Sequence, residues 1–156
     1  VDTRLKKLSE NKCDAIILAY AGLSRLGLEE KITEEFSLQT ILPAACQGVI
    51  GIECLTNNKN LINQLKTLQD PSTYLSTSVE RAMLKVLDAD CNSPIASYAE
   101  INSNIIKLTG LVASLDGKNI IKEEFSSHKN KYEEIGVKVG KKLLEKGAKA
   151  LLNIPK

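Results

Sequence analysis

The chain has 156 residues, of which 43% are hydrophobic and 26% are charged, the balance of an ordinary globular protein rather than a disordered one. Its formal net charge of +2 is too small to favour nucleic acid or an anionic membrane surface as a partner. No apolar run approaches the roughly 20 residues of a membrane-spanning helix, so no membrane association is expected.

The first part of the chain has the pattern of an α/β fold. Helical spacing of apolar residues predicts a helix over residues 1–10, and the apolar run at 13–21 is typical of a strand buried on both faces of a parallel sheet. Gly22 would end that strand before a short helix or turn. A second buried strand is predicted at 49–54, followed by a helix with its apolar face at Leu61, Ile62, Leu65 and Leu68.

The pattern changes near residue 70. Asp70-Pro71 combines a carboxylate N-cap with proline at the first helical position, and it starts a helix whose apolar stripe runs to Leu87. Three strands with turns between them are predicted at 95–101, 105–114 and 119–125. A helix with Ile135, Val139 and Leu143 inward should end at Gly147, and a last strand is expected at 148–154.

These elements predict incomplete α/β pieces followed by a small α+β domain with a three-stranded antiparallel sheet and helices. The chain begins at Val1 inside a helical pattern, so we expect it to be a piece of a longer protein. The part before residue 70 has too few strands to form a complete sheet by itself.

Gly22 and Arg25 follow the first predicted strand. Ligands of open α/β sheets bind beyond the carboxyl ends of strands, where glycine allows close approach and an arginine suits a carboxylate. The residues alone nevertheless favour an ordinary turn with an exposed arginine, and Arg4 is a weaker candidate. Gln47-Gly48 offers a similar choice between a ligand-binding loop and a plain hinge.

The four cysteines are Cys13, Cys46, Cys54 and Cys91. They form no Cys-x-x-Cys pair and the chain has a single histidine, so neither a metal site nor a disulfide framework is expected. Reduced thiols in a cytoplasmic protein are expected instead. Cys91 lies in a polar turn and should be the most accessible, but Asp88 and Asp90 disfavour its thiolate, so the local sequence favours an unreactive thiol.

Short motifs follow one another along nearly the whole chain, from Val1 to about Leu152. They are Val1-Asp2-Thr3-Arg4-Leu5, Asp14-Ala15-Ile16-Ile17-Leu18-Ala19, Ala21-Gly22-Leu23-x-Arg25-Leu26, Leu42-Pro43-Ala44, Gln47-Gly48, Gly51-Ile52-Glu53, Glu80-Arg81-Ala82 and Cys91-x-x-Pro94-Ile95-Ala96. In order and spacing the chain resembles the C-terminal half of the porphobilinogen deaminase (hydroxymethylbilane synthase) family.

The resemblance implies a transferase that condenses four porphobilinogen molecules into hydroxymethylbilane, with release of ammonia, in tetrapyrrole and haem biosynthesis. It implies a dipyrromethane cofactor in thioether linkage to Cys91. Arg4 and Arg25 would bind the carboxylates of the pyrroles, and Gly22, Gln47 and Gly48 would line the same cleft. The catalytic carboxylate of the family lies upstream, so the chain alone should be inactive and needs the N-terminal half of the enzyme.

The resemblance also implies an arrangement of domains. Residues 1–44 would be the latter part of a second α/β domain, 45–68 a return to a first α/β domain, and 69–156 the cofactor-carrying domain. The first two domains would be similar to periplasmic binding proteins. The partners would be porphobilinogen and the growing polypyrrole chain, and the full enzyme is expected to be a monomer.

Asn92 stands where the family commonly has glutamine, and two further departures from the family pattern precede Cys91 and Gln47. Ala89-Asp90 stands where Gly-Gly usually precedes the cofactor cysteine, and Cys46 stands where glycine usually precedes Gln47-Gly48. A non-catalytic small-molecule binding module with the same periplasmic-binding-protein-like fold is the main alternative. A degenerate structural relative is a third possibility, and the two departures motivate it.

Overall fold

The computed structural model describes residues 1–88, 90 and 92–152. Its chain divides into two compact units, Val1–Thr40 and Ile41–Lys156. Within the described residues, no helix is both long and apolar enough to cross a membrane. The ordered core belongs to the second unit.

The first unit is helical with long connections. It contains α1 (Asp2–Ser9), α2 (Tyr20–Ser24) and the short 3-10 helix η1 (Glu29–Lys31). The predicted strand at 13–21 is wrong, and Gly22 lies inside α2 instead of ending a strand. A strand needs a hydrogen-bonded neighbour, and every strand in the described part of the chain belongs to the sheet of the second unit, so Ile17 remains 65% exposed.

The predicted strand at 49–54 is also absent. This segment has no strand partner within the described residues, and Ile50 is 79% exposed. The helix predicted after it is confirmed as α3 (Lys59–Lys66), where the side chain of Asn58 accepts a hydrogen bond from the Leu61 N–H at 3.1 Å. An amphipathic stripe with an N-cap was therefore sufficient for the helix, while the strands require partners from elsewhere.

The long helix α4 (Pro71–Leu87) confirms the prediction made from Asp70-Pro71. The Asp70 carboxylate accepts a hydrogen bond from the Thr73 N–H at 2.7 Å, and proline occupies the first turn, where no N–H partner is needed. At its other end Asp88 adopts a left-handed conformation, with φ of 51°. Both ends of α4 are thus set by local sequence.

An antiparallel sheet follows, in the order β1-β2-β3, as predicted. Its strands are β1 (Ile95–Asn102), β2 (Ile105–Ala113) and β3 (Ile120–His128). Ser103 and Gly117 have positive φ in the two connecting turns, at 56° and 69°. This register places Ser97 opposite Gly110, and Gly110 opposite Glu123.

The chain ends in helices, after the 3-10 turn η2 (Lys129–Lys131). The predicted helix is α5 (Tyr132–Glu145), and Gly147 follows it with φ of 93°, as a helix-terminating glycine should. The predicted final strand is wrong over 148–152, which form α6 (Ala148–Leu152); residues 153 and 154 lie outside the described part. Ala, Lys and Leu are strong helix formers, and fully buried Ala148 joins the core from this helix.

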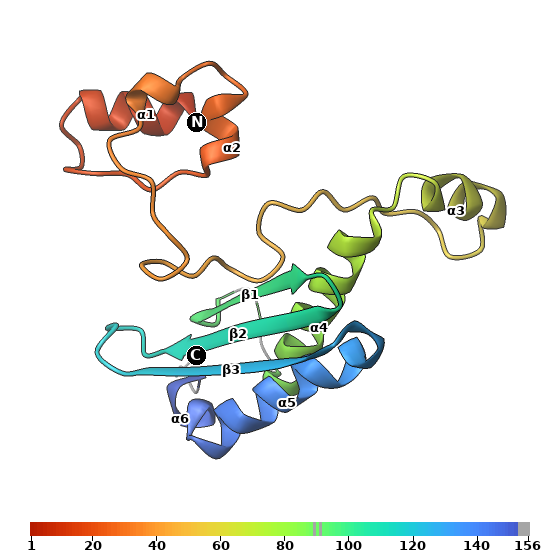
Figure 1. Cartoon of the computed structure of the whole chain (residues 1–156). Helices are drawn as coiled ribbons and strands as arrows, with labels where there is room; N and C mark the ends of the chain where they lie inside the picture. The colour runs from red at the N-terminus through yellow and green to blue at the C-terminus, as the bar shows by residue number, and fades with distance from the viewer. Residues whose placement is uncertain (89, 91, 153–156) are drawn as a thin grey trace. The chain divides into compact units, whose positions relative to one another are not determined.

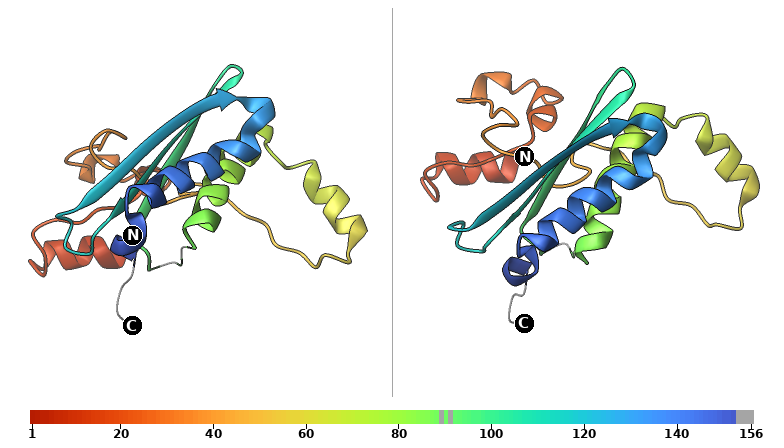
Figure 2. Two further views of the ribbon diagram at one scale, coloured as in Figure 1. Left: turned by 90° about the horizontal axis from the view of Figure 1, so that it is seen from below. Right: turned by 60° about the horizontal axis from the view of Figure 1, so that its bottom comes forward.

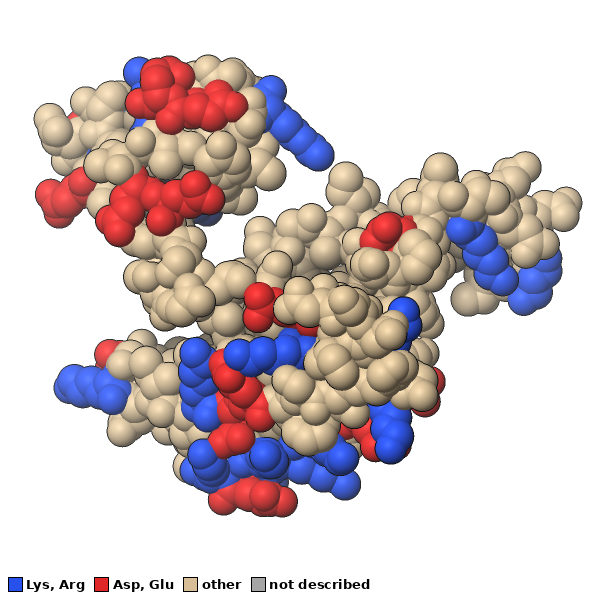
Figure 3. Space-filling view, viewed as in Figure 1, with Lys and Arg blue, Asp and Glu red and all other residues tan. Residues whose placement is uncertain are grey.

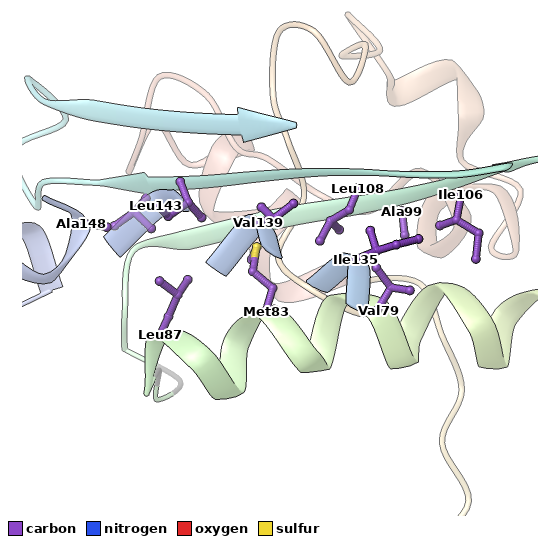
Figure 4. Packing of buried hydrophobic residues seen from close by; sticks show 11 residues of the cluster. Val79, Met83, Leu87, Ala99, Ile106, Leu108, Ile135, Val139, Leu143 and Ala148 are labelled. Atoms are coloured by element: carbon purple, nitrogen blue, oxygen red, sulfur yellow. The ribbon is translucent and has the colours of Figure 1, made fainter. Parts of the chain in front are cut away.

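Helices α4 and α5 pack side by side on one face of the sheet (Figures 1 and 2). The core lies between the sheet and the two helices (Figure 4), and burial of each large apolar side chain contributes roughly 1.5–3 kcal/mol. Its buried members are Val79, Met83, Leu87, Ala99, Ile106, Leu108, Val112, Ile135, Val139, Leu143 and Ala148.

Three glycines allow this close packing. A Cβ on Gly136 would overlap the carbonyl oxygen of Val79, and a Cβ on Gly140 would lie 2.8 Å from the Val86 side chain. On β2, a Cβ on Gly110 would overlap the sulfur of Met83. Glycine is required at these contacts because helix meets helix and helix meets sheet at backbone distance.

Candidate functional site

Arg4, Gly22 and Arg25, predicted from the sequence, lie in the first unit. Arg4 is exposed on α1, and Arg25 is exposed at the end of α2. Among the described residues, no salt bridge involves either arginine, so both guanidinium groups can bind a carboxylate ligand. A Cβ added to Gly22 would lie 3.6 Å from Cγ2 of Val1, which is an ordinary van der Waals contact. The first turn of α2 and the residue before α1 are therefore neighbours.

Gln47 and Gly48 lie in the second unit, in the loop over residues 41–49. The Gln47 N–H donates to the carbonyl of Ala44 at 3.1 Å, which closes a tight turn. Cys46 and Gly48 both have left-handed backbones, with φ of 59° and 78°. Gly48 takes this conformation without cost, whereas at Cys46 the Cβ makes the backbone conformation strained. Position 46 is also where the family usually has glycine.

The carboxylate of Glu80 anchors this loop to the sheet. Glu80 lies on α4 and is only 5% exposed. One of its oxygens, Oε2, accepts a hydrogen bond from the Cys46 N–H at 2.5 Å, and Oε1 accepts one from the Ala99 N–H at 2.9 Å. A single side chain therefore joins the loop, α4 and β1.

The same three elements line a cavity of about 190 Å³. Its wall includes Gln47 from the loop, Thr73, Ser76 and Thr77 on α4, and residues 97–99 of β1. The Ser97 hydroxyl is fully buried and makes no hydrogen bond among the described residues. The wall is thus mainly polar and already holds a carboxylate.

Burial affects the acidity of two groups at this site. Desolvation raises the pKa of Glu80 above its usual range, although the N–H groups of Cys46 and Ala99 oppose the shift. The pKa of the Cys46 thiol is raised too, first by burial and then by the charge of Glu80. A raised pKa makes the Cys46 thiol less nucleophilic than an exposed cysteine at neutral pH.

Cys91 lies outside the described residues, but hydrogen bonds join its described neighbours Asp90, Asn92 and Ser93. The Asp90 carboxylate accepts hydrogen bonds from the Asn92 N–H at 3.0 Å and from the Ser93 hydroxyl at 2.9 Å. Ser93 in turn accepts from the Asp90 N–H at 3.1 Å. The unusual aspartate therefore has a structural function, because it closes the turn by its own side chain.

On the face of the sheet and α5 shown in Figure 3, charges of both signs lie close together among the described residues. Figure 3 shows acidic and basic side chains intermingled over β3 and α5. Glu123 pairs with Lys142 and Lys146, and Lys107 lies 2.9 Å from Glu124. These pairs neutralise one another, so this surface offers no electrostatic site for a polyanion.

Sequence reasoning did not identify Glu80 as a functional residue. It was noticed as part of Glu80-Arg81-Ala82, but its neighbours Val79 and Met83 suggested a purely apolar stripe. A signal was present, because position 80 is three residues before Met83 and seven before Leu87, on the buried side of α4. A carboxylate at such a position needs partners, and the structure supplies two N–H groups.

Two protein-family models match the chain in succession. Residues 1–63 match the model described as "Porphobilinogen deaminase, dipyromethane cofactor binding domain", and residues 74–145 match "Porphobilinogen deaminase, C-terminal domain". The first match contains Arg4, Gly22, Arg25, Gln47 and Gly48. Cys91 falls in the second.

Curated relatives carry the same name. The porphobilinogen deaminase of Ruthia magnifica subsp. Calyptogena magnifica is 45% identical over 152 residues, which are 97% of this chain and 50% of the relative. Those of Bacillus pumilus (strain SAFR-032) and Carboxydothermus hydrogenoformans are 44% and 43% identical, over 98% and 96% of this chain and 49% and 48% of the relatives. The chain spans about half the length of these relatives. With two models of one family in sequence order and relatives of this similarity, the chain belongs to the porphobilinogen deaminase family.

Proposed function

We propose that the full-length protein containing this chain is a porphobilinogen deaminase (hydroxymethylbilane synthase). It is a transferase that condenses four porphobilinogen molecules into hydroxymethylbilane and releases ammonia, in tetrapyrrole and haem biosynthesis. The observation that carries this proposal is the successive match of residues 1–63 and 74–145 to two domains of that one enzyme.

The dipyrromethane cofactor would be held by a thioether to Cys91, and when bound it supplies the pyrrole end to which substrate units are added. The chemistry of the described residues fits such a group. Every pyrrole unit carries carboxylates, and exposed Arg4 and Arg25 are cations without an ion-pair partner among the described residues. Asp90 and Ser93, which precede and follow Cys91 in the sequence, are hydrogen-bonded to each other.

Gln47, Gly48 and Gly22 would complete the cleft. Gln47 offers an exposed amide, and the left-handed backbone at Gly48 leaves its surroundings open, with nothing within 4 Å of an added Cβ. A flat pyrrole can approach a backbone more closely where no side chain intervenes.

The domain arrangement proposed from the sequence remains the best account of the exposed apolar segments. Residues 1–44 would complete a second α/β domain, 45–68 a first one, and 69–156 would be the domain that carries the cofactor. The first two would have the periplasmic-binding-protein-like architecture. Ile17 and Ile50, at 65% and 79% exposure, support this assignment because each lies in a run that reads as a buried strand.

The partners follow from the same proposal. The chain would act together with the N-terminal half of the enzyme, which supplies the catalytic carboxylate, and the chain alone would be inactive. Porphobilinogen and the growing polypyrrole are the expected ligands of a monomeric, cytoplasmic enzyme. A non-catalytic binding module is not favoured by any feature of the described residues.

Intact-mass spectrometry of the full-length protein tests the function. The wild type should carry a covalent increment of two pyrrole units, which Cys91→Ser should lose together with activity. Cys13→Ser is the matched control, since Cys13 is a free thiol elsewhere in the chain, and it should keep the increment. Turnover of porphobilinogen by a protein of unmodified mass would contradict the proposed cofactor attachment. A modified mass without turnover would contradict the proposed activity and support only the attachment of the cofactor to Cys91.

A second experiment tests Arg25. Arg25→Ala should impair chain elongation, and Arg25→Lys should restore it only in part because lysine lacks the planar fork that binds a carboxylate in two places. Lys31→Ala is the control, an exposed cation of the same unit. Normal product formation by Arg25→Ala would remove this residue from the site.

A further inference from the structure

The buried carboxylate of Glu80 accepts two backbone hydrogen bonds, which a carboxylate exposed to water would not need. Its side chain bridges the N–H groups of Cys46 and Ala99, which are 34 and 19 residues away in sequence. No salt bridge among the described residues involves Glu80. A buried carboxylate without a cation is costly, and two charge-assisted hydrogen bonds to backbone donors are the arrangement that stabilises one.

The loop over residues 41–49 has few other attachments. The carbonyl of Pro43 accepts a hydrogen bond from the Ser97 N–H at 3.0 Å, and the Cys46 thiol lies 3.9 Å from the carbonyl of Thr77, a weak contact. The left-handed backbone of Cys46 costs free energy, so other contacts must stabilise the observed geometry of the loop. Of the hydrogen bonds that join this loop to the rest of the domain among the described residues, only the bond from the Cys46 N–H to Glu80 has a carboxylate acceptor.

The helix that carries Glu80 also leads toward Cys91 in the sequence, because α4 continues from Glu80 to Leu87. Seven residues of α-helix correspond to about 10 Å along the axis. A helix of this length is stiff, so the position of the loop is fixed relative to Leu87, four residues before Cys91 in the sequence.

We propose that Glu80 is a positioning residue, which holds the Gln47-Gly48 loop against α4 and β1 and thereby sets its position relative to Leu87, where α4 ends before the chain runs on to Cys91. This inference rests on the proposed function, because it assigns the loop to the pyrrole cleft. This role requires no contact between Glu80 and the substrate. Glu80 acts through the backbone of Cys46.

The test compares Glu80→Gln with Glu124→Gln in the full-length enzyme. Glutamine keeps one acceptor oxygen, so it can satisfy only one of the two N–H groups. Glu124 is the control because it also loses a carboxylate of the same domain, but its partners, Lys107 and Thr109, belong to the sheet. Four properties are measured for each variant: the steady-state kinetics (KM and kcat) with porphobilinogen, the covalent mass increment, amide hydrogen exchange over residues 41–49, and the melting temperature.

Glu80→Gln should raise the KM about tenfold, the effect of losing one hydrogen bond to a charged acceptor. Exchange at Cys46 should become faster by a similar factor, while the two-pyrrole increment and the melting temperature stay close to the wild type. Glu124→Gln should change none of the four. Glu80→Asp, which keeps the charge but cannot span both donors, should resemble Glu80→Gln and serves if that variant folds poorly.

Unchanged KM and unchanged exchange at Cys46 in Glu80→Gln would overturn the proposal. It would also be overturned if activity fell only in proportion to a lowered melting temperature, because that is the result of a purely structural role. Failure of the proposed function gives a different result, since the wild type would then show neither turnover nor a covalent increment. Faster exchange at Cys46 without any effect on KM would separate the contact from the reaction and likewise overturn the inference.

Discussion

Substitution of Gly136 by alanine should destabilise the C-terminal domain although alanine favours helices. Gly136 is fully enclosed where α5 crosses α4. The new Cβ would overlap the carbonyl oxygen of Val79 and would lie 2.8 Å from both the Ala82 Cβ and the Met83 nitrogen. Two of these three neighbours are backbone atoms, which no rotamer change can move away.

The magnitude follows from two opposing effects. Alanine in place of glycine stabilises a helix interior by about 0.8–1 kcal/mol. Overpacking typically costs about 1–3 kcal/mol and occasionally more, and relief here requires the two helices to separate, because carbon contacts are favourable only near 3.5–4 Å. We therefore expect a net destabilisation of roughly 2 kcal/mol, at the upper end of the overpacking range minus the gain in propensity.

Hydrogen exchange of the full-length protein measures this loss locally. Core amides of α4, β2 and α5 should exchange about 30-fold faster in Gly136→Ala, since each 1.4 kcal/mol corresponds to a factor of ten. Lys141→Ala, an exposed change on the same helix, should leave these amides within a factor of about two. Equal or slower exchange in Gly136→Ala would refute the close-packing argument, because it would mean that propensity outweighs the contact.

Three further predictions concern the loop, a helix cap and the exposed apolar segments. Cys46→Gly should slow amide exchange over residues 41–49 by up to about fivefold, because it removes roughly 1 kcal/mol of left-handed strain; faster exchange would show that the thiol contact matters more. The hydrogen bond from Thr73 lowers the pKa of Asp70, so its stabilising effect is complete above its unfolded value near pH 4 and is lost as the pH falls through the lower folded value. Asp70→Asn should thus flatten this acidic limb of a thermal unfolding profile, and an unchanged limb would contradict the assignment. In the full-length protein, residues 14–19 and 49–53 should be protected from exchange as paired strands, and rapid exchange at both would disprove the proposed sheets.

The C-terminal domain could be predicted from sequence because its signals are local. Asp70-Pro71 marks the start of α4, and the turn around Ser103 and the one at Gly117 separate strands of alternating pattern. Each of these features depends on residues within a few positions of one another. The predicted antiparallel sheet and its covering helices therefore agree with the structure.

The errors have non-local causes. The runs around Ile17 and Ile50 have strand composition, but a strand forms only when another supplies its hydrogen bonds. Residues 148–152 were too short and apolar to distinguish strand from helix by period. Glu80 was missed because its two donors, at Cys46 and Ala99, are distant in sequence and only the fold brings them together.

The outer edge of β1 would otherwise present free N–H groups, as every sheet edge does. Here the Ser97 N–H donates to Pro43 and the Ala99 N–H donates to Glu80, so two adjacent outward donors of the edge are occupied. An occupied edge cannot recruit a strand from another molecule, and uncontrolled strand addition is a main route to aggregation. The loop that we assign to the cleft thus also protects the domain in solution, and variants that release it should tend to self-associate as well as lose activity.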